Sequence, residues 1–549
     1  MMKMNRFAKY LIVSIIAVLP MAATAQEHNE QVTVEGSFRP QIKRSERIVK
    51  MPETPQNNFN IPNYKAQTKD FDFGFDMEVE TMSAVPYVSS SDYYGKDNFL
   101  KLALGTRLSP VLSFHHSSEL SKKMMLSVGV NHYSSWVDQK DYKKSTFMNN
   151  GVNVMTVNKF KTGQLCISGD YHYDMYHLRS YGDADGNAVT NKNGRNIHSV
   201  KVGAKWSSVG TSYRQLYQEY SGDYRYTGIM GGTHESQVNM KAHLAYSDDS
   251  YVVSGDVDVN YGHIYKNLFM MALRPNFNMS GDMYNVRLGF GLDFKTDDKV
   301  GIYPDVKGSL FLLDNDLELY VKAGGKSKIN TFESVVKENP FVTTDFSYLS
   351  DFGYEKTKID LGLGAKMNVV KMIDVHVGVR YRVVKDGLFF VPDLDFFAEY
   401  DGDETIYHLQ TFGVTFMDYN VLNVMADANW KINEQADAAI SLSYNGYSIE
   451  FPYYKPSFEM TLSGGYKYDE FWKFDASMSI VGKRWAMNEC GGNIQLKPAF
   501  DIKLGADYQI DEDFSAFAEV HNLFHDKYQL YYNYPSMGFE LFAGLKYKF

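Results

Sequence analysis

The segment Tyr284–Lys295, which reads YNVRLGFGLDFK, decides the fold class of this chain. Every second residue from Tyr284 to Phe294 is apolar, whereas the residues between them are polar, charged or glycine. Because a β-strand points successive side chains to opposite faces, this segment has one apolar face and one charged face. It therefore predicts a strand that separates an apolar environment from a wet one.

The same alternation recurs along the chain, at residues 317–324, 358–368, 500–508 and 539–549. Such segments run for about 8–12 residues, and a tilted membrane strand needs about 9–11. A soluble sandwich also alternates, with its apolar side inward. Three features favour a membrane barrel instead: the strands are long, small or charged residues recur on the polar face, and aromatic residues gather near strand ends.

We therefore predict an all-β fold, a large antiparallel transmembrane β-barrel of about 22 strands, in a range of about 20–24. The tally of candidate strand segments is about 24, and residues 384–420 are the place where a hairpin is most easily miscounted. Inside a bilayer only helices and closed barrels satisfy every backbone N–H and C=O group. Beyond residue 25 the sequence holds no apolar run of about 18 residues, which excludes a helical membrane protein.

Short and long connections alternate between the predicted strands. The short ones include the turn-forming residues 247–250 and 313–316, and the long ones include 177–195, 328–354 and 525–537. Outer-membrane barrels have short periplasmic turns and longer outer loops. We therefore expect a barrel in the outer membrane of a Gram-negative envelope, in contact with its lipid and with both termini in the periplasm.

Composition excludes several other classes of protein. The chain has 549 residues, with 56 Lys and Arg against 66 Asp and Glu, and a net charge of −10. The acidic balance gives no support for nucleic-acid binding. Two cysteines exclude a disulfide framework and a cysteine-rich metal domain.

The first residues read as an export signal. Lys3, Arg6 and Lys9 form a basic start, a short apolar stretch follows, and small residues precede a cleavage site after Ala25. Residues 1–25 are therefore predicted to be a signal peptide.

The rest of the chain divides into two predicted parts. Residues 26–96 form a short, loosely ordered periplasmic segment, which is rich in proline and carries a basic cluster at 43–50. Residues 97–549 form the barrel. The 26–96 segment is a candidate for closing the lumen or for binding a partner.

The last strand ends in phenylalanine, and its alternate residues share one apolar face. A strand of this kind looks like the assembly signal that bacterial outer-membrane barrels present to the barrel-assembly machinery. The residues of this signal are Leu541, Ala543, Leu545, Tyr547 and Phe549.

The preceding strand and loop carry a family resemblance. Residues 517–528 (FAEVHNLFHDKY), followed by 534–538 and the final strand, resemble the end of TonB-dependent receptors. Met537-Gly538-Phe539 stands where that family often has Pro-Gly-Arg. The resemblance implies a barrel of 22 strands and a role in uptake across the outer membrane.

A second match to this family lies near the start of the mature chain. The residues Val32, Thr33, Val34, Glu35 and Gly36 resemble the segment that pairs with the energy-coupling protein by strand addition. The family then has a folded plug domain, but here only about 60 residues precede the first clear barrel strand, in a segment rich in proline and charge. The chain thus resembles a receptor that lacks the usual plug, which puts energy-coupled uptake in doubt.

Candidate chemical sites are few. Asp183, Asp185 and Asn187 have the spacing of a calcium loop but lack its downstream glutamate, and a solvated outer loop is the favoured alternative. Aromatic residues gather in two predicted outer loops, where they could stack on a ligand or anchor the chain at the membrane interface, the interpretation that we favour. These are Tyr453, Tyr454, Tyr528, Tyr531 and Tyr532. No arrangement of catalytic residues is found, so we expect neither an enzyme nor a cofactor.

Two functions follow as hypotheses. The first is an outer-membrane barrel that takes part in passage or uptake of a solute, with a surface lipoprotein as a possible source of the substrate. The alternative is a plug-less, non-transporting barrel that acts as a scaffold in an envelope complex and holds a periplasmic partner through residues 26–96. Because a barrel this wide would leak if left open, what closes the lumen is the feature that distinguishes the two.

Overall fold

The structure is a computed structural model that describes residues 98–139, 144–181, 193–208, 216–248, 251–296, 299–343, 353–369, 372–400, 404–488, 490–529 and 531–549. For residues 180–181, 394–400 and 404–408 the description extends to the backbone only. The predicted signal peptide and the 26–96 segment lie outside the described residues.

Strands make up nearly all of the described chain. The barrel strands are β1 (Phe99–Gly105), β2 (Ser109–Ser121), β3 (Met124–Ser135), β4 (Phe147–Lys159), β5 (Gly163–His177), β7 (Gly194–Ser208), β8 (Leu216–Ile229), β9 (His234–Ser247), β10 (Tyr251–His263), β11 (Asn267–Gly281), β12 (Tyr284–Lys295), β13 (Gly301–Leu312), β14 (Leu317–Ile329), β15 (Tyr354–Val369), β16 (Ile373–Tyr400), β17 (Glu404–Lys431), β18 (Ala436–Tyr447), β19 (Phe458–Lys467), β20 (Trp472–Val481), β23 (Ala499–Gln509), β24 (Phe514–His521) and β25 (Glu540–Lys548). The remaining elements are β6 (Arg179–Tyr181), β21 (Arg484–Met487), β22 (Asn493–Leu496) and the helix α3 (Phe332–Glu338).

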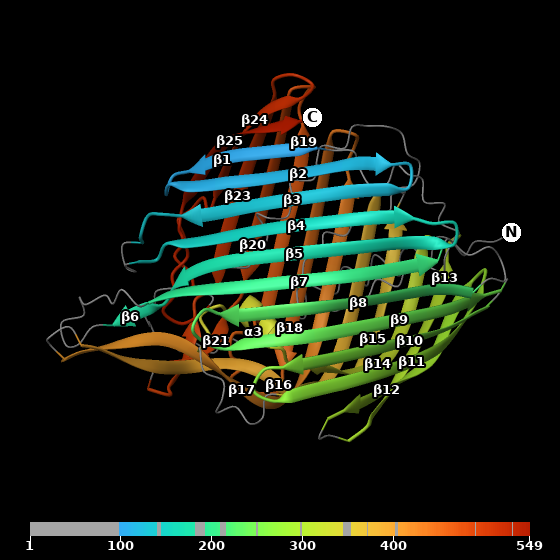
Figure 1. The fold of residues 1–549 in the computed structure, drawn as a ribbon. Helices are drawn as coiled ribbons and strands as arrows, with labels where there is room; N and C mark the ends of the chain where they lie inside the picture. The colour runs from blue at the N-terminus through green and yellow to red at the C-terminus, as the bar shows by residue number, and fades with distance from the viewer. Residues whose placement is uncertain are drawn as a thin grey trace, which may run out of the picture. The chain divides into compact units, whose positions relative to one another are not determined.

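Within the described part of the chain, 22 of these strands form one closed antiparallel ring. Each barrel strand pairs with the barrel strands before and after it, and Figure 1 shows β1 to β5 and β7 to β12 side by side in one wall. The ring closes where β25 pairs with β1, from Phe99 opposite Lys548 to Gly105 opposite Phe542. The predicted fold class and strand number are therefore confirmed.

The long connections all leave the ring at one end, whereas the other end carries short turns. One end carries turns such as the two residues between β2 and β3, and Phe549 at the C-terminus donates a backbone hydrogen bond to Asn98 at this end. The other end carries the longer loops, including the one between β14 and β15 that contains α3. We call these ends the turn end and the loop end, and the space inside the ring the lumen.

The strands β16 and β17 explain why the sequence tally exceeded the number of barrel strands. Each is 28 residues long, and they stay paired as one ribbon up to Tyr400 opposite Glu404. Figure 1 shows this ribbon running past the edge of the barrel, where β6 pairs with β17. The alternating pattern within 384–420 therefore belongs to one long hairpin rather than to additional barrel strands.

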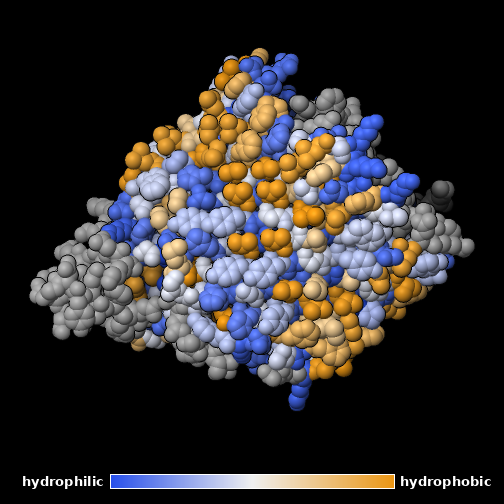
Figure 2. Space-filling view, in the orientation of Figure 1, coloured by the Kyte–Doolittle hydropathy of each residue, from blue (hydrophilic) through white to orange (hydrophobic). Residues whose placement is uncertain are grey.

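The strand faces are those that the alternation predicts. On β12, Leu288 and Phe290 point outward and are 52% and 48% exposed, whereas Asp293 points inward and is fully buried. Figure 2 shows hydrophobic side chains across much of the strand-covered wall. The outer surface of the ring is thus suited to lipid and the inner surface to water.

Among the described residues, no helix is long and apolar enough to cross a membrane.

The register of β12 can be tested with two matched substitutions. Phe290→Arg places a charge against lipid and should cost roughly 2–4 kcal/mol near the midplane, whereas Asn285→Arg faces the lumen and should be tolerated. The measurement is the yield of heat-modifiable, membrane-inserted barrel for each variant. Equal assembly defects in the two variants would contradict the register.

Candidate functional site

The loops at the loop end meet over the lumen and pack into one apolar core. We call the segments that form this core the loop layer. They come from the β10–β11 turn, the β14–β15 loop, the β16–β17 ribbon, the β24–β25 loop and the rims of β5, β7 and β8. The buried members are Tyr176, Leu178, Ile197, Ile229, Ile264, Phe332, Val335, Val336, Phe341, Val342, Leu388, Phe390, Leu409, Phe412, Val414, Tyr531 and Tyr534. Because these segments leave the ring at distant points of its circumference, their contacts lie across the lumen.

The helix α3 supplies the centre of this loop layer. Thr331 is its N-cap and accepts a hydrogen bond from the backbone N–H of Ser334 (3.1 Å), while the Ser334 hydroxyl accepts one from the N–H of Thr331 (3.2 Å). This reciprocal pair satisfies two backbone donors that the start of a helix leaves unpaired. The apolar residues Phe332 and Val335 can then turn into the core.

Polar contacts attach α3 to the inner wall of the ring at β8 and β9. Glu333 lies 3.3 Å from the guanidinium of Arg225 on β8 and 3.4 Å from the amide of Gln237 on β9. The backbone N–H of Glu333 donates to the carboxylate of Glu235, which is 1% exposed (3.1 Å). Burial raises the pKa of Glu333, but Lys337 and Arg225 outweigh it and hold this pKa below its ordinary value. Glu333 is therefore ionised at neutral pH and links α3 to the wall by charge-assisted hydrogen bonds.

The β24–β25 loop packs on α3 from the other side. The rings of Tyr534 and Phe341 stack with their centroids 3.8 Å apart, and the Tyr534 hydroxyl donates to the carbonyl of Gln410 on β17. Arg179 of β6 donates to the carbonyl of Asn533 (2.8 Å). One loop thus joins the β16–β17 ribbon, the β5–β6 segment and the helix.

A buried arginine supports the same loop from the hairpin of β21 and β22. Arg484 is 2% exposed and donates to the carbonyl of Gln529. Burial lowers the pKa of Arg484 to about 10, so the side chain stays charged at neutral pH. The loop layer is therefore held by buried polar contacts as well as by apolar packing.

Below the loop layer, the inner wall of the ring is lined with ion pairs that join neighbouring strands or, for Lys101 on β1 and Glu519 on β24, strands on either side of β25. Examples are Arg274 with Asp293 (3.0 Å), Arg287 with Asp305 (2.8 Å), Arg380 with Asp360 (2.6 Å) and Lys101 with Glu519 (2.7 Å). Charges of both signs are interspersed in these pairs. Paired and partly exposed side chains of this kind fit a water-filled lumen.

The aromatic residues proposed for ligand stacking lie mostly inside the loops. Tyr453, Tyr528 and Tyr531 are 8%, 1% and 8% exposed and pack on buried residues of other loops and of strand ends. Tyr454 and Tyr532 remain partly exposed. Ligand stacking stays a prediction, and these two rings are the ones that a ligand could reach.

The remaining predicted sites fall on strands or beyond the described chain. The outward residues of the C-terminal strand lie on the lipid side of β25, where Leu541, Leu545 and the terminal Phe549 are exposed. Two predicted sites lie outside the described residues: the calcium candidate Asp183, Asp185 and Asn187, and the coupling segment Val32, Thr33, Val34, Glu35 and Gly36. Within the described residues, no group of three or more His, Cys, Asp or Glu could hold a metal ion.

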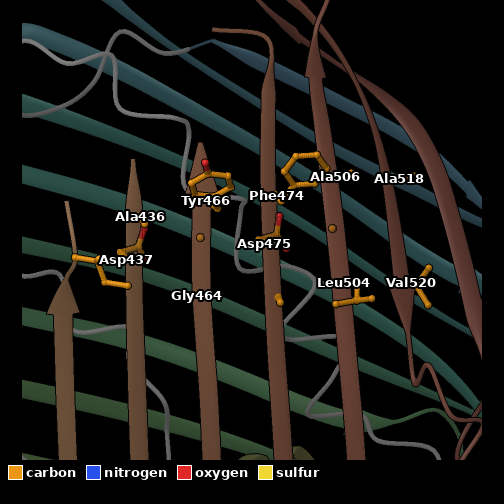
Figure 3. A pocket seen from close by; sticks show the side chains of 14 residues that line it. Ala436, Asp437, Gly464, Tyr466, Phe474, Asp475, Leu504, Ala506, Ala518 and Val520 are labelled. Atoms are coloured by element: carbon orange, nitrogen blue, oxygen red, sulfur yellow. The ribbon is translucent and has the colours of Figure 1, made fainter. Parts of the chain in front are cut away.

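A shallow depression lies on the outward face of β18 to β24 and has a volume of about 630 Å³. Figure 3 shows Tyr466 and Phe474 at one edge and Leu504 and Val520 at the other, with small residues such as Ala506 between them. Since Tyr466, Phe474 and Leu504 are outward and exposed, lipid chains would fill this depression.

Sequence reasoning did not find α3 or its docking residues. The local signal is present, because Thr331 and Ser334 have the spacing of a capped helix start. Their role depends on Arg225 and Gln237, however, which are about 100 residues away in the chain and share no motif with them.

No protein-family model matches the sequence, and no curated protein matches it. Solved structures do match. They include the copper transporter OprC, with 13% identity over 82% of this chain and 80% of that chain and a TM-score of 0.59. The ferric-catecholate import receptor Fiu of E. coli K12 has 9% identity, covering 83% and 82% of the two chains with a TM-score of 0.62. The siderophore receptor PirA of Acinetobacter baumannii has 9% identity, covering 82% and 80% with a TM-score of 0.62.

These likenesses establish the fold. The described residues have the barrel of outer-membrane receptors, and the resemblance to TonB-dependent receptors is confirmed at that level.

The packing of the loop layer can be tested by removing a buried aromatic ring from its core. Phe412 is fully buried, so Phe412→Ala should cost about 3–5 kcal/mol locally and expose the outer loops to protease. The heat-modifiable barrel should persist, because Phe412 lies outside the ring. Phe524→Ala is the matched control, since Phe524 is 65% exposed and its loss should change little. Equal protease resistance of the two variants would contradict a loop core centred on Phe412.

Proposed function

We propose that this chain is an outer-membrane barrel that takes part in the regulated passage or uptake of a solute, and that its own outer loops close the lumen. The observation that carries the proposal is the position of the loop layer. It crosses a wide ring whose inner wall is charged and wet. A gated passage needs a lumen that is closed by the loop layer at one end and lined with charged residues below it.

The similar structures support this choice by analogy of fold. Their titles describe a copper transporter and receptors that import ferric-catecholate or siderophores. We propose the same class of role for this chain, with the turn end in the periplasm and the loop end outside. No enzymatic activity or cofactor is part of the proposal.

Partners follow from the two ends of the chain. The barrel-assembly machinery would recognise the outward face of the C-terminal strand during insertion, through Leu541, Leu545 and Phe549. Residues 26–96 would bind a periplasmic partner, and a surface lipoprotein would deliver the solute at the loop end.

The scaffold role remains the second candidate, and one observation favours it. The loop layer buries its aromatic residues as fully as a domain core does, with Phe332, Phe341, Phe412 and Tyr534 all 2% exposed or less. A permanent seal of this kind would suit a barrel that presents its surfaces to partners and transports nothing.

Single-channel conductance in a planar bilayer separates the two roles. The wild-type mature protein should be closed, and the doubly substituted variant Phe341→Ala, Tyr534→Ala should show large conductance steps, because it removes the stacked pair that joins two loops. A protein lacking residues 26–96 should stay closed, since the loops remain.

Two results would overturn this proposal. Closed behaviour in the doubly substituted variant, with its loops shown by protease to be loosened, would favour the scaffold. Large steps in the protein lacking residues 26–96 alone would show that this segment, rather than the loop layer, closes the lumen.

A further inference from the structure

Four basic side chains and one glycine form a row across five neighbouring strands on the inner wall. In the register of β12 to β16, Arg287 lies opposite Lys307, Lys307 opposite Lys322, Lys322 opposite Gly362 and Gly362 opposite Arg380. All five positions face the lumen. We call this set the basic row.

Like charges directly opposite each other on neighbouring strands destabilise a sheet. The basic row has two such pairs in succession, Arg287 with Lys307 and Lys307 with Lys322. Like-charged pairs also occur singly on this wall, as where Lys101 lies opposite Lys546 and Lys201 lies opposite Arg225. The basic row differs in that it carries two such pairs in succession across three strands.

The acids around the basic row are too few to neutralise it. Asp305 pairs with Arg287 at 2.8 Å. Glu318 is shared by Lys307 (3.6 Å) and Lys366 (3.5 Å).

Asp360 pairs with Arg380 (2.6 Å) and lies opposite Arg382 in the register. From the paired row of Glu318 to that of Asp360, the inward positions of β12 to β16 carry three acids, which are Asp305, Glu318 and Asp360. The same positions carry six bases, which are Arg287, Lys307, Lys322, Lys366, Arg380 and Arg382. His376 lies in the row of Glu318. A net positive charge remains on this part of the wall.

Glycine leaves room beside the basic row. A side chain added at Gly362 would meet its nearest neighbours, Lys322 and the carbonyl of Val379, only at 3.9 Å. The positions on either side hold Lys322 and Arg380, both partly exposed. A recess therefore lies between two cationic side chains and opens toward the lumen.

We propose that the basic row binds the solute and that this solute is a small molecule with two or more oxyanion groups, phosphate or carboxylate. Lysine and arginine form short charge-assisted hydrogen bonds with both groups. Lys322 and Arg380 hold one group over Gly362, and Lys307 and Arg287 hold a second along the wall. The assignment of this anion as the transported solute rests on the proposed passage function, whereas the binding itself does not.

The test measures binding by calorimetry on the purified mature protein in detergent micelles, with pyrophosphate and citrate as probes and glucose as the uncharged reference. The wild type should bind at least one of the two anions, and which one it binds more tightly decides between phosphate and carboxylate. Lys322→Gln should raise the Kd about tenfold, which is the loss expected for one charge-assisted contact. Gly362→Leu, which fills the recess without changing charge, should raise it as well.

Lys241→Gln is the matched control. Lys241 is also an inward lysine, on β9, and it lies 3.5 Å from Asp258 outside the basic row. This variant should bind as the wild type does. Equal losses in Lys322→Gln and Lys241→Gln would mean that the anion responds only to overall charge, and that result would overturn the proposal, as would absence of binding by the wild type.

The binding experiment tests the anion site separately from the proposed passage of a solute. Anion binding that depends on Lys322, in a protein that stays closed in every conductance experiment, would leave the site in place and remove the transport role. Conductance without anion binding would keep the transport role and remove the site.

Discussion

Closure of the strand ring is the constraint on which the rest of this structure depends. Each backbone N–H or C=O left unpaired in a bilayer costs several kcal/mol, so a membrane sheet cannot keep a free edge. The pairing of β25 with β1 along the whole of β1 removes both edges at once. A closed ring then has one lipid face and one lumen face, and the alternation of apolar and polar residues follows from that division. It also places the C-terminal strand beside the first barrel strand, so that Phe549 meets Asn98 at the turn end.

A ring of this size creates a second requirement, because its lumen is wide enough to leak. The described chain meets it with loops that leave the ring at distant points and meet in the middle. Apolar residues from α3, the β16–β17 ribbon and the β24–β25 loop form the barrier, and the contact of Glu333 with Arg225 fixes it to the wall. Below the barrier the wall stays charged, and the basic row is the part of it that we propose binds an anion. The described chain thus combines an apolar barrier at the loop end with a charged inner wall.

The sequence predicted the ring better than it predicted the site, for a physical reason. Strand faces are local, so Leu288 and Arg287 could be assigned to opposite sides from their spacing alone. The strand tally was too high within 384–420, because a ribbon that leaves the barrel keeps the same alternation as one that crosses the membrane. The buried position of Tyr531 and the docking of α3 depend on which loops meet, and only the closed ring decides that. The basic row also needed the register, since its members come from five separate strands.

The most direct test of this account uses the two native cysteines as reporters on either side of the loop layer. Cys490 is exposed in a turn at the loop end, whereas Cys166 faces the lumen near the turn end of β5. The measurement is the rate at which a membrane-impermeant maleimide modifies each cysteine on intact cells. The account predicts rapid modification of Cys490 and protection of Cys166 until the periplasmic side is opened. Modification of Cys166 at the rate of Cys490 would show an open lumen, and protection of Cys490 would show that the loop end does not face outward. Either result would contradict the account.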